Sequence, residues 1–129
     1  MPQKRRQKAK ILMIEDNIFL RKLYRDKLTH AGFDFIEATN GIEGLNKVFS
    51  ESPDLVILDL ILPRKNGFDV LDEIRKNKKT KDIPVIILSN LGQAMDIKEG
   101  LARGAQEYLV KTDIRLSDAV EKIKKWLRE

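Results

Sequence analysis

Short, continuously apolar segments recur along the chain, and they alternate with longer segments in which apolar residues return every three or four positions. The first pattern is typical of strands buried on both faces of a parallel sheet, and the second of helices with one buried face. The predicted strands are Ile11–Ile14, Phe33–Ala38, Leu55–Asp59, Pro84–Leu88 and Tyr108–Val110. Phe33–Ala38 mixes polar and apolar residues, which favours a position at the edge of the sheet.

Each predicted strand is followed by a predicted helix. Asn17 is a suitable N-terminal cap for the first helix, and Gly32 stands where a C-terminal glycine is common. The apolar positions expected to face the core are Leu20, Leu23, Tyr24 and Leu28, then Ile42, Leu45, Val48 and Phe49, then Phe68, Leu71 and Ile74, and finally Leu116, Val120, Ile123 and Leu127. The fourth helix, Met95–Arg103, is the weakest, because Gly100 inside it costs about 1 kcal/mol relative to Ala. Lys76–Lys81 is expected to be a solvated loop.

Alternation of strands and helices through short loops predicts the α/β fold class. Right-handed crossovers would place five helices on both faces of a five-stranded parallel sheet, in a doubly wound, flavodoxin-like arrangement. The length of 129 residues suits one domain, and no internal repeat indicates a second.

The composition narrows the class of protein. With 42% hydrophobic and 35% charged residues, the chain reads as a soluble globular protein. No apolar run approaches the ~20 residues that span a bilayer, so no membrane partner is expected. The absence of cysteine excludes disulfides, thiolate metal sites and a cysteine nucleophile. Together with the lack of a secretory signal pattern, this favours a cytoplasmic location.

The net charge of +5 comes from the N-terminus. Five basic residues precede or open the first strand, with no acidic residue among them: Lys4, Arg5, Arg6, Lys8 and Lys10. Of 25 basic residues this leaves 20, against 20 acidic ones, so the folded body is nominally neutral. Residues 1–9 could contact nucleic acid or a membrane surface. Because no aromatic residue interleaves the charges, we expect a disordered, solubilising tail instead and regard nucleic acid as an unlikely partner.

Polar side chains collect where the strands end. Glu15 and Asp16 follow the first strand, and Asp59 ends the third, while Ser89 follows the fourth and Lys111 the fifth. The carboxyl ends of parallel strands meet at one edge of the sheet, which is where ligands bind in open α/β folds. Converging carboxylates repel one another unless they hold a hard cation such as Mg²⁺. A hydroxyl and an ammonium group nearby suit a phosphoryl group, for which Asp59 would be the nucleophile.

These motifs resemble the receiver domain of two-component response regulators. The resemblance covers residues 10–129, and its segments are Ile14–Asn17, Leu58–Pro63 with Gly67, Ile87–Asn90, and Gly104–Ala105 leading to Tyr108 and Lys111. It implies the strand order 2-1-3-4-5, in which the topological switch between the first and third strands places Glu15, Asp16 and Asp59 together.

The resemblance also implies a role for each residue. Asp59 would be the phosphoacceptor, and Mg²⁺ would be held by Asp16, Asp59 and the backbone carbonyl of Ile61, with Glu15 acting through water. Ser89 and Lys111 would contact the phosphate, and Tyr108 would move with Ser89. The chain would then be a stand-alone, monomeric single-domain regulator. Its phosphodonor would be a histidine kinase or histidine phosphotransfer protein. An unknown target would bind the face formed by the fourth helix, fifth strand and fifth helix.

Such a module is not an enzyme beyond its own phosphorylation and dephosphorylation, and two other classes fit less well. An aspartyl phosphohydrolase generally carries a second Asp two residues after the nucleophile, where this chain has Ile61. A flavodoxin-like binder of flavin or nucleotide needs a Gly-rich loop after the first strand, where Glu15 and Asp16 would repel a phosphate.

Three positions depart from the receiver pattern. Thr112 follows Lys111 where proline is usual, which favours a trans bond there. Asn90 replaces a small residue and could narrow access to the site. Ile61 offers no side chain that could orient an attacking water, which puts the lifetime of the phosphate in question.

Overall fold

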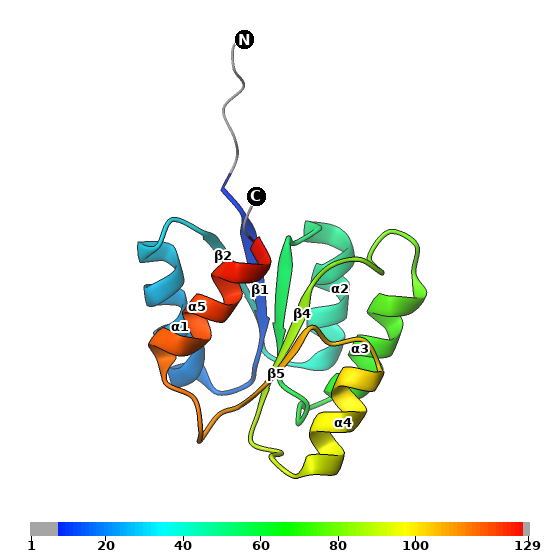
Figure 1. Ribbon diagram of the computed structural model, residues 1–129. Coiled ribbons are helices and arrows are strands. Elements are labelled where there is room, and N and C mark those ends of the chain that lie inside the picture. The colour runs from blue at the N-terminus through cyan, green and yellow to red at the C-terminus, as the bar shows by residue number, and fades with distance from the viewer. Residues whose placement is uncertain (1–7, 128–129) are drawn as a thin grey trace.

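The computed structural model describes residues 8–127, in which strands and helices alternate along the chain (Figure 1). The strands are β1 (Lys10–Ile14), β2 (Asp34–Ala38), β3 (Leu55–Leu58), β4 (Val85–Ser89) and β5 (Glu107–Val110). The helices are α1 (Ile18–His30), α2 (Gly41–Glu51), α3 (Gly67–Lys76), α4 (Ala94–Ala102) and α5 (Leu116–Leu127). Each predicted element is present, with ends that differ by a few residues.

The five strands form one parallel sheet in the order β2-β1-β3-β4-β5. Helices α1 and α5 cover one face of the sheet, and α2, α3 and α4 cover the other (Figure 1). The doubly wound α/β fold and its strand order are therefore confirmed. The expected edge position of β2 is confirmed as well, and its mixed composition is explained by its having only one neighbouring strand.

Two apolar clusters hold the layers together. In β1, Ile11 and Met13 pack toward Tyr24 and Leu28 of α1, whereas the intervening residues contribute to the cluster on the opposite face. This alternation follows from the two-residue repeat of a strand. The central strands β1, β3 and β4 are almost fully buried, which explains their continuous apolar sequences.

Some expectations about burial are wrong. Leu23 was expected to face the core, but it is 54% exposed. Ile42 and Phe49 of α2 are also exposed, by 40% and 42%. The stretch Lys76–Lys81 is exposed as expected except at Thr80, which is buried and whose Oγ1 donates a hydrogen bond to the Ile74 carbonyl oxygen, 2.7 Å away. Periodicity alone could not show these differences, since they depend on which turns the neighbouring elements cover.

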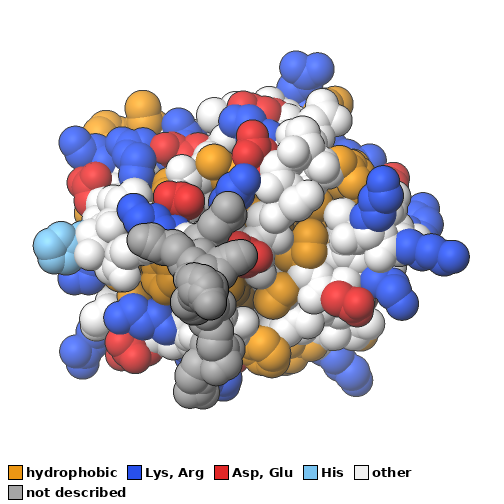
Figure 2. All heavy atoms as spheres, turned by 90° about the horizontal axis from the view of Figure 1, so that it is seen from above, with side chains coloured by type: hydrophobic (Ala, Val, Ile, Leu, Met, Phe, Trp, Pro, Cys, Tyr) orange, Lys and Arg blue, Asp and Glu red, His pale blue; other side chains and the backbone are white. Residues whose placement is uncertain are grey.

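The start of β1 and the end of α5 lie at the amino-terminal end of the sheet, opposite the predicted site (Figure 1). Figure 2 looks onto that end, where basic and acidic side chains are interspersed among apolar ones. Most of the predicted tail, residues 1–7, lies outside the described residues. None of the helices between residues 8 and 127 is long and apolar enough to cross a membrane.

Candidate functional site

The strand register brings the acidic residues together. Ile14 at the end of β1 is paired with Leu58 at the end of β3, so Glu15 and Asp59 leave the sheet as neighbours. The backbone N–H of Asp59 donates to the Ile14 carbonyl at 3.1 Å and fixes this arrangement beyond the last strand pair. A shift of one residue in the pairing of β1 with β3 would move these two carboxylates apart. The register of the sheet therefore determines the site.

Lys111 joins the cluster from β5. Its Nζ lies 3.0 Å from Asp59 Oδ2 and 2.8 Å from Glu15 Oε1. The Glu15 side chain is 1% exposed and that of Asp59 6% exposed, so one partly buried ammonium compensates two buried carboxylates. The Lys111–Glu15 contact is an ion pair without hydrogen-bond geometry. Among residues 8–127, Glu15 Oε1 is the one buried side-chain oxygen or nitrogen atom that lacks a hydrogen-bond partner.

The proton affinities of the cluster follow from this geometry. Burial raises the pKa of the Glu15 carboxyl above its usual value, and the nearby Asp59 charge adds to that shift, while Lys111 and the Asn17 N–H partly oppose it. Burial works against the ammonium of Lys111. Its close contacts and charge interactions with Glu15 and Asp59 outweigh that effect and raise the pKa of Lys111. With three carboxyl groups and one ammonium group, the cluster has more acidic groups than its own lysine can neutralise.

A cleft of about 340 Å³ opens over this cluster. Its lining residues are Glu15, Asp16, Asn17, Asp59, Ile61, Asn90 and Lys111. Four of the predicted site side chains therefore meet in one cavity, and Ile61 stands at its mouth with 59% of its surface exposed. Asn17 was interpreted only as a helix cap. Its position directly after the acidic pair was the signal that it would also line the cleft.

Ser89 and Tyr108 are not part of the cleft lining. Ser89 is fully buried, and its Oγ accepts the N–H of Leu91 at 3.2 Å. The Tyr108 hydroxyl donates to the Leu91 carbonyl at 2.6 Å. These two predicted switch residues are thus connected to each other through the backbone of Leu91.

The donor set suits a hard divalent cation. Carboxylate oxygens of Glu15, Asp16 and Asp59 all lie within 4.8 Å of one another. No sulfur or imidazole belongs to the group. Oxygen ligands on one open side are what Mg²⁺ accepts while keeping several waters. Asp59 Oδ1 is held in place by the backbone N–H of Leu60 at 2.7 Å.

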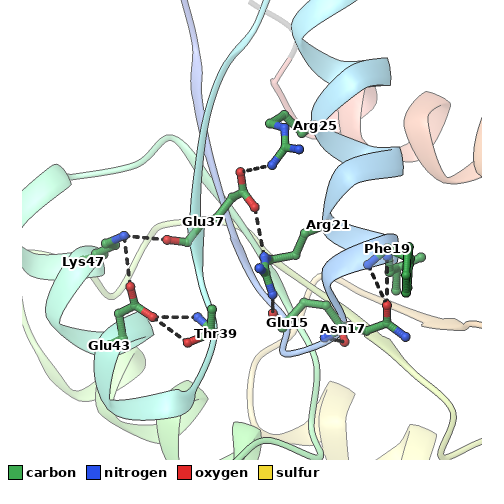
Figure 3. Close-up of polar contacts among 10 residues, drawn as sticks. Glu15, Asn17, Phe19, Arg21, Arg25, Glu37, Thr39, Glu43 and Lys47 are labelled. Atoms are coloured by element: carbon green, nitrogen blue, oxygen red, sulfur yellow. Dashed lines mark hydrogen bonds and ion pairs between the residues drawn. The ribbon is translucent and has the colours of Figure 1, made fainter.

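A network of charged side chains from α1 and β2 contacts the backbone of Glu15 (Figure 3). Glu37 of β2 accepts from Arg21 Nε at 2.9 Å and from Arg25 at 2.6 Å. Arg21 also donates to the Glu15 carbonyl at 2.9 Å, and Asn17 N–H donates to Glu15 Oε2 at 3.0 Å. Hydrogen bonds therefore hold Glu15 in place at both its backbone carbonyl and its carboxylate. Sequence reasoning missed Arg21 and Glu37, because their contact joins α1 to an edge strand.

Comparison with known proteins identifies the family. Residues 11–124 match the family model of the response regulator receiver domain, so the chain belongs to that family. This agrees with the fold and with the acidic cleft. The chain is thus a receiver domain of two-component signalling, and the match confirms the resemblance.

Individual relatives give the same result. The chain is 40% identical over 102 residues to "DNA-binding dual master transcriptional regulator RpaA" of Synechocystis sp., covering 79% of this chain and 42% of the relative. It is 39% identical over 104 residues to "Probable transcriptional regulator ycf27" of Guillardia theta, covering 81% and 40%. The chain thus spans about 40% of the length of these curated relatives. The name of the first does not fit our expectation that nucleic acid is an unlikely partner.

Solved structures match over nearly the whole chain. Chemotaxis protein CheY4 of Vibrio cholerae superimposes with a TM-score of 0.84 at 27% identity, covering 92% of this chain and 98% of that one. A putative response regulator of Chloroflexus aurantiacus gives a TM-score of 0.88 at 25% identity, covering 95% and 100%. The receiver fold is therefore shared along the full sheet and both helical layers.

Proposed function

We propose that the domain accepts a phosphoryl group on Asp59 and so switches the binding of a protein partner. The observation that carries the proposal is the carboxylate of Asp59, which lies at the base of an acidic cleft with the Lys111 ammonium 3.0 Å away. A carboxylate oxygen of Asp59 attacks phosphorus, and the new O–P bond forms as the donor's N–P bond breaks. The electron pair stays on the donor imidazole nitrogen, which takes a proton from solvent.

Mg²⁺ is the cofactor that we propose for this step. Asp16, Asp59 and the backbone carbonyl of Ile61 would hold the ion directly, and Glu15 would hold it through water. When bound, the ion neutralises negative charge on the phosphoryl oxygens. Lys111 remains as the second positive group, and it contacts the phosphate once it leaves its pairing with Asp59. We expect Asp16→Ala to weaken Mg²⁺ binding with little loss of stability, because Asp16 is exposed.

The phosphodonor is a histidine kinase or a histidine phosphotransfer protein. Next to the cleft, α1 exposes Ile18, Phe19 and Leu23, of which Phe19 is 78% exposed. A groove of about 170 Å³ between α1 and the residues before α5 continues this surface, and Lys111 lines both the groove and the cleft. A partner that brings a phosphohistidine to Asp59 would cover these apolar side chains. Their contact with the partner would supply binding energy independent of the reaction.

The output is a change at the face formed by α4, β5 and α5. Ser89 moves toward the phosphate, and Tyr108 follows through the Leu91 segment that joins them. We propose a monomeric, cytoplasmic domain that acts alone through this face. The curated relatives are longer proteins, and a linked DNA-binding segment would replace the separate target in such an arrangement.

Intact mass spectrometry tests the acceptor. The protein is incubated with acetyl phosphate and Mg²⁺, and one phosphoryl group should add to the wild type and none to Asp59→Asn. Asp113→Asn, which changes an exposed aspartate outside the cleft, is the matched control and should behave as the wild type. Addition that persists in Asp59→Asn would overturn the assignment. Rapid multiple turnover of a small phosphate ester would favour a phosphohydrolase instead.

A further inference from the structure

The last turn of α4 lies against an aromatic ring at a position where no side chain would fit. Gly100 is the buried residue of α4. A Cβ atom at this position would lie 2.8 Å from Cδ2 and 3.0 Å from Cε2 of Tyr108, and 2.7 Å from Cδ1 of Ile87. Real Cβ atoms essentially never approach other atoms closer than 3.0 Å. The ring of Tyr108 therefore packs directly on the backbone of α4, and only glycine allows this.

That ring is also the end of a hydrogen-bonded connection. The Tyr108 hydroxyl holds the Leu91 carbonyl at 2.6 Å, and the Leu91 N–H is held by Ser89 Oγ at 3.2 Å. Because the phenol group is rigid, the position of its hydroxyl is set by where its ring rests. A displacement of the ring away from Gly100 would break the short hydrogen bond between the Tyr108 hydroxyl and the Leu91 carbonyl.

Glycine in this position has a cost that the packing must offset. In a helix interior it destabilises by about 1 kcal/mol relative to Ala. α4 is only nine residues long, so it has few turns over which to absorb that cost. A glycine at this position is therefore explained by the close approach of Tyr108 and Ile87 and not by the needs of the helix.

We propose that Gly100 is a positioning residue for Tyr108: by having no side chain, it sets the ring position that links α4 to Ser89 through Leu91. The role of this contact in switching rests on the proposed function, because Ser89 is the residue expected to respond to the phosphate. The Gly100–Tyr108 contact itself is a matter of packing, and it can be tested without any phosphorylation.

The first experiment measures urea unfolding of Gly100→Ala in three backgrounds: wild type, Tyr108→Ala and Ile87→Val. Lys98→Ala compared with Lys98→Gly is the control, because Lys98 is exposed on the same helix and reports the ordinary gain from Gly to Ala. That gain should be about fivefold in the folding equilibrium constant. Gly100→Ala should lose this gain or reverse it in the wild type, recover most of it with Tyr108→Ala, and recover part of it with Ile87→Val. An equal gain in every background would overturn the proposal.

The second experiment measures amide chemical shifts when beryllium fluoride and Mg²⁺ are added. In the wild type, shifts are expected at Leu60, at Leu91 and along residues 98–102. In Gly100→Ala, the shifts at residues 98–102 should fall by half or more, while the shift at Leu60 stays. Undiminished shifts at residues 98–102 would show that Gly100 does not link the helix to Ser89. If even Leu60 in the wild type did not respond, the proposed acceptor function would fail and the linkage with it, whereas the packing role would still be decided by unfolding.

Discussion

Lys111 Nζ lies 3.0 Å from Asp59 Oδ2, although the two residues follow strands that are not neighbours in the sheet. β4 lies between them, so the lysine side chain crosses over the end of that strand to reach the carboxylate. The same Nζ reaches Glu15 on the far side, at the end of β1. One side chain therefore compensates charges delivered by two other strands, and it spans the cleft that we assign to the phosphoryl group.

Replacing Lys111 by methionine should destabilise the metal-free protein. Glu15 and Asp59 would then be buried without a counter-charge, and breaking such a group costs about 3 kcal/mol when the remaining charge stays buried. Because Mg²⁺ can supply the missing charge, millimolar Mg²⁺ should restore more stability to Lys111→Met than to the wild type. Urea unfolding with and without Mg²⁺ measures this. Lys98→Met, at an exposed position, should show neither effect, and equal stability of Lys111→Met and wild type would contradict the charge argument.

The central strands and the strand-end residues could be read from the sequence for a physical reason. A strand buried on both faces must be apolar throughout. The apolar run Leu55–Leu58 and the change to a carboxylate at Asp59 are therefore easy to recognise in the sequence. Parallel pairing then brings strand ends to one edge, which places Asp59 and Lys111 together without knowledge of any contact. The resemblance to receiver domains added the order of the strands, which periodicity cannot supply.

Ile61→Asn should shorten the lifetime of the phosphorylated state. Ile61 lies at the mouth of the cleft and offers an incoming water no hydrogen bond, whereas asparagine offers both a donor and an acceptor. A water-orienting hydrogen bond worth about 1 kcal/mol would speed hydrolysis about fivefold. The loss of phosphoprotein after removal of acetyl phosphate, followed by intact mass, gives the rate. Ile61→Val is the control, and a rate unchanged in Ile61→Asn would mean that water enters elsewhere.

Phe19→Ala should slow phosphorylation by a protein donor and leave phosphorylation by acetyl phosphate unchanged. Phe19 is exposed beside the cleft, so its loss removes contact area for a partner without altering the acidic cluster. An aromatic side chain at the centre of an interface is worth about 2 kcal/mol. Transfer rates with the two donors, measured on the same preparations, check the prediction. Phe49→Ala is the control, because Phe49 is also exposed but lies on α2.

Contacts between elements were less accessible to sequence reasoning. Leu23 fits the helical repeat of α1 as well as Leu28 does, yet only Leu28 is covered by a neighbouring element. Arg75 is another case, because its guanidinium donates to the carbonyl oxygens of Gly104 and Ile83 at 2.8 Å each. These contacts depend on the relative placement of α3 and the loops before β4 and β5. No local pattern of residues encodes that placement.

The last prediction concerns the Glu37 network, which supports the backbone of Glu15. Burial alone would raise the pKa of Glu37, but the hydrogen bonds from Arg25 and Arg21 outweigh it and lower the pKa below the ordinary value of 4.5. A carboxyl group whose pKa is lower in the folded state binds protons more readily when unfolded. Its contribution is therefore present above pH 4.5 and is lost as the pH falls through the folded value.

Glu37→Gln should consequently lower the free energy of unfolding at pH 7 by about 1 kcal/mol, a size typical of partly exposed ion pairs. The difference between wild type and variant should shrink as the pH is lowered from 4.5, because protonated Glu37 resembles glutamine. Urea unfolding at pH 7, 5, 4 and about 3 measures the difference. In an Arg25→Gln background the same substitution should cost less, since one of the two guanidinium partners is already gone. A difference that stays constant down to the lowest pH would mean that shape, and not charge, gives Glu37 its role.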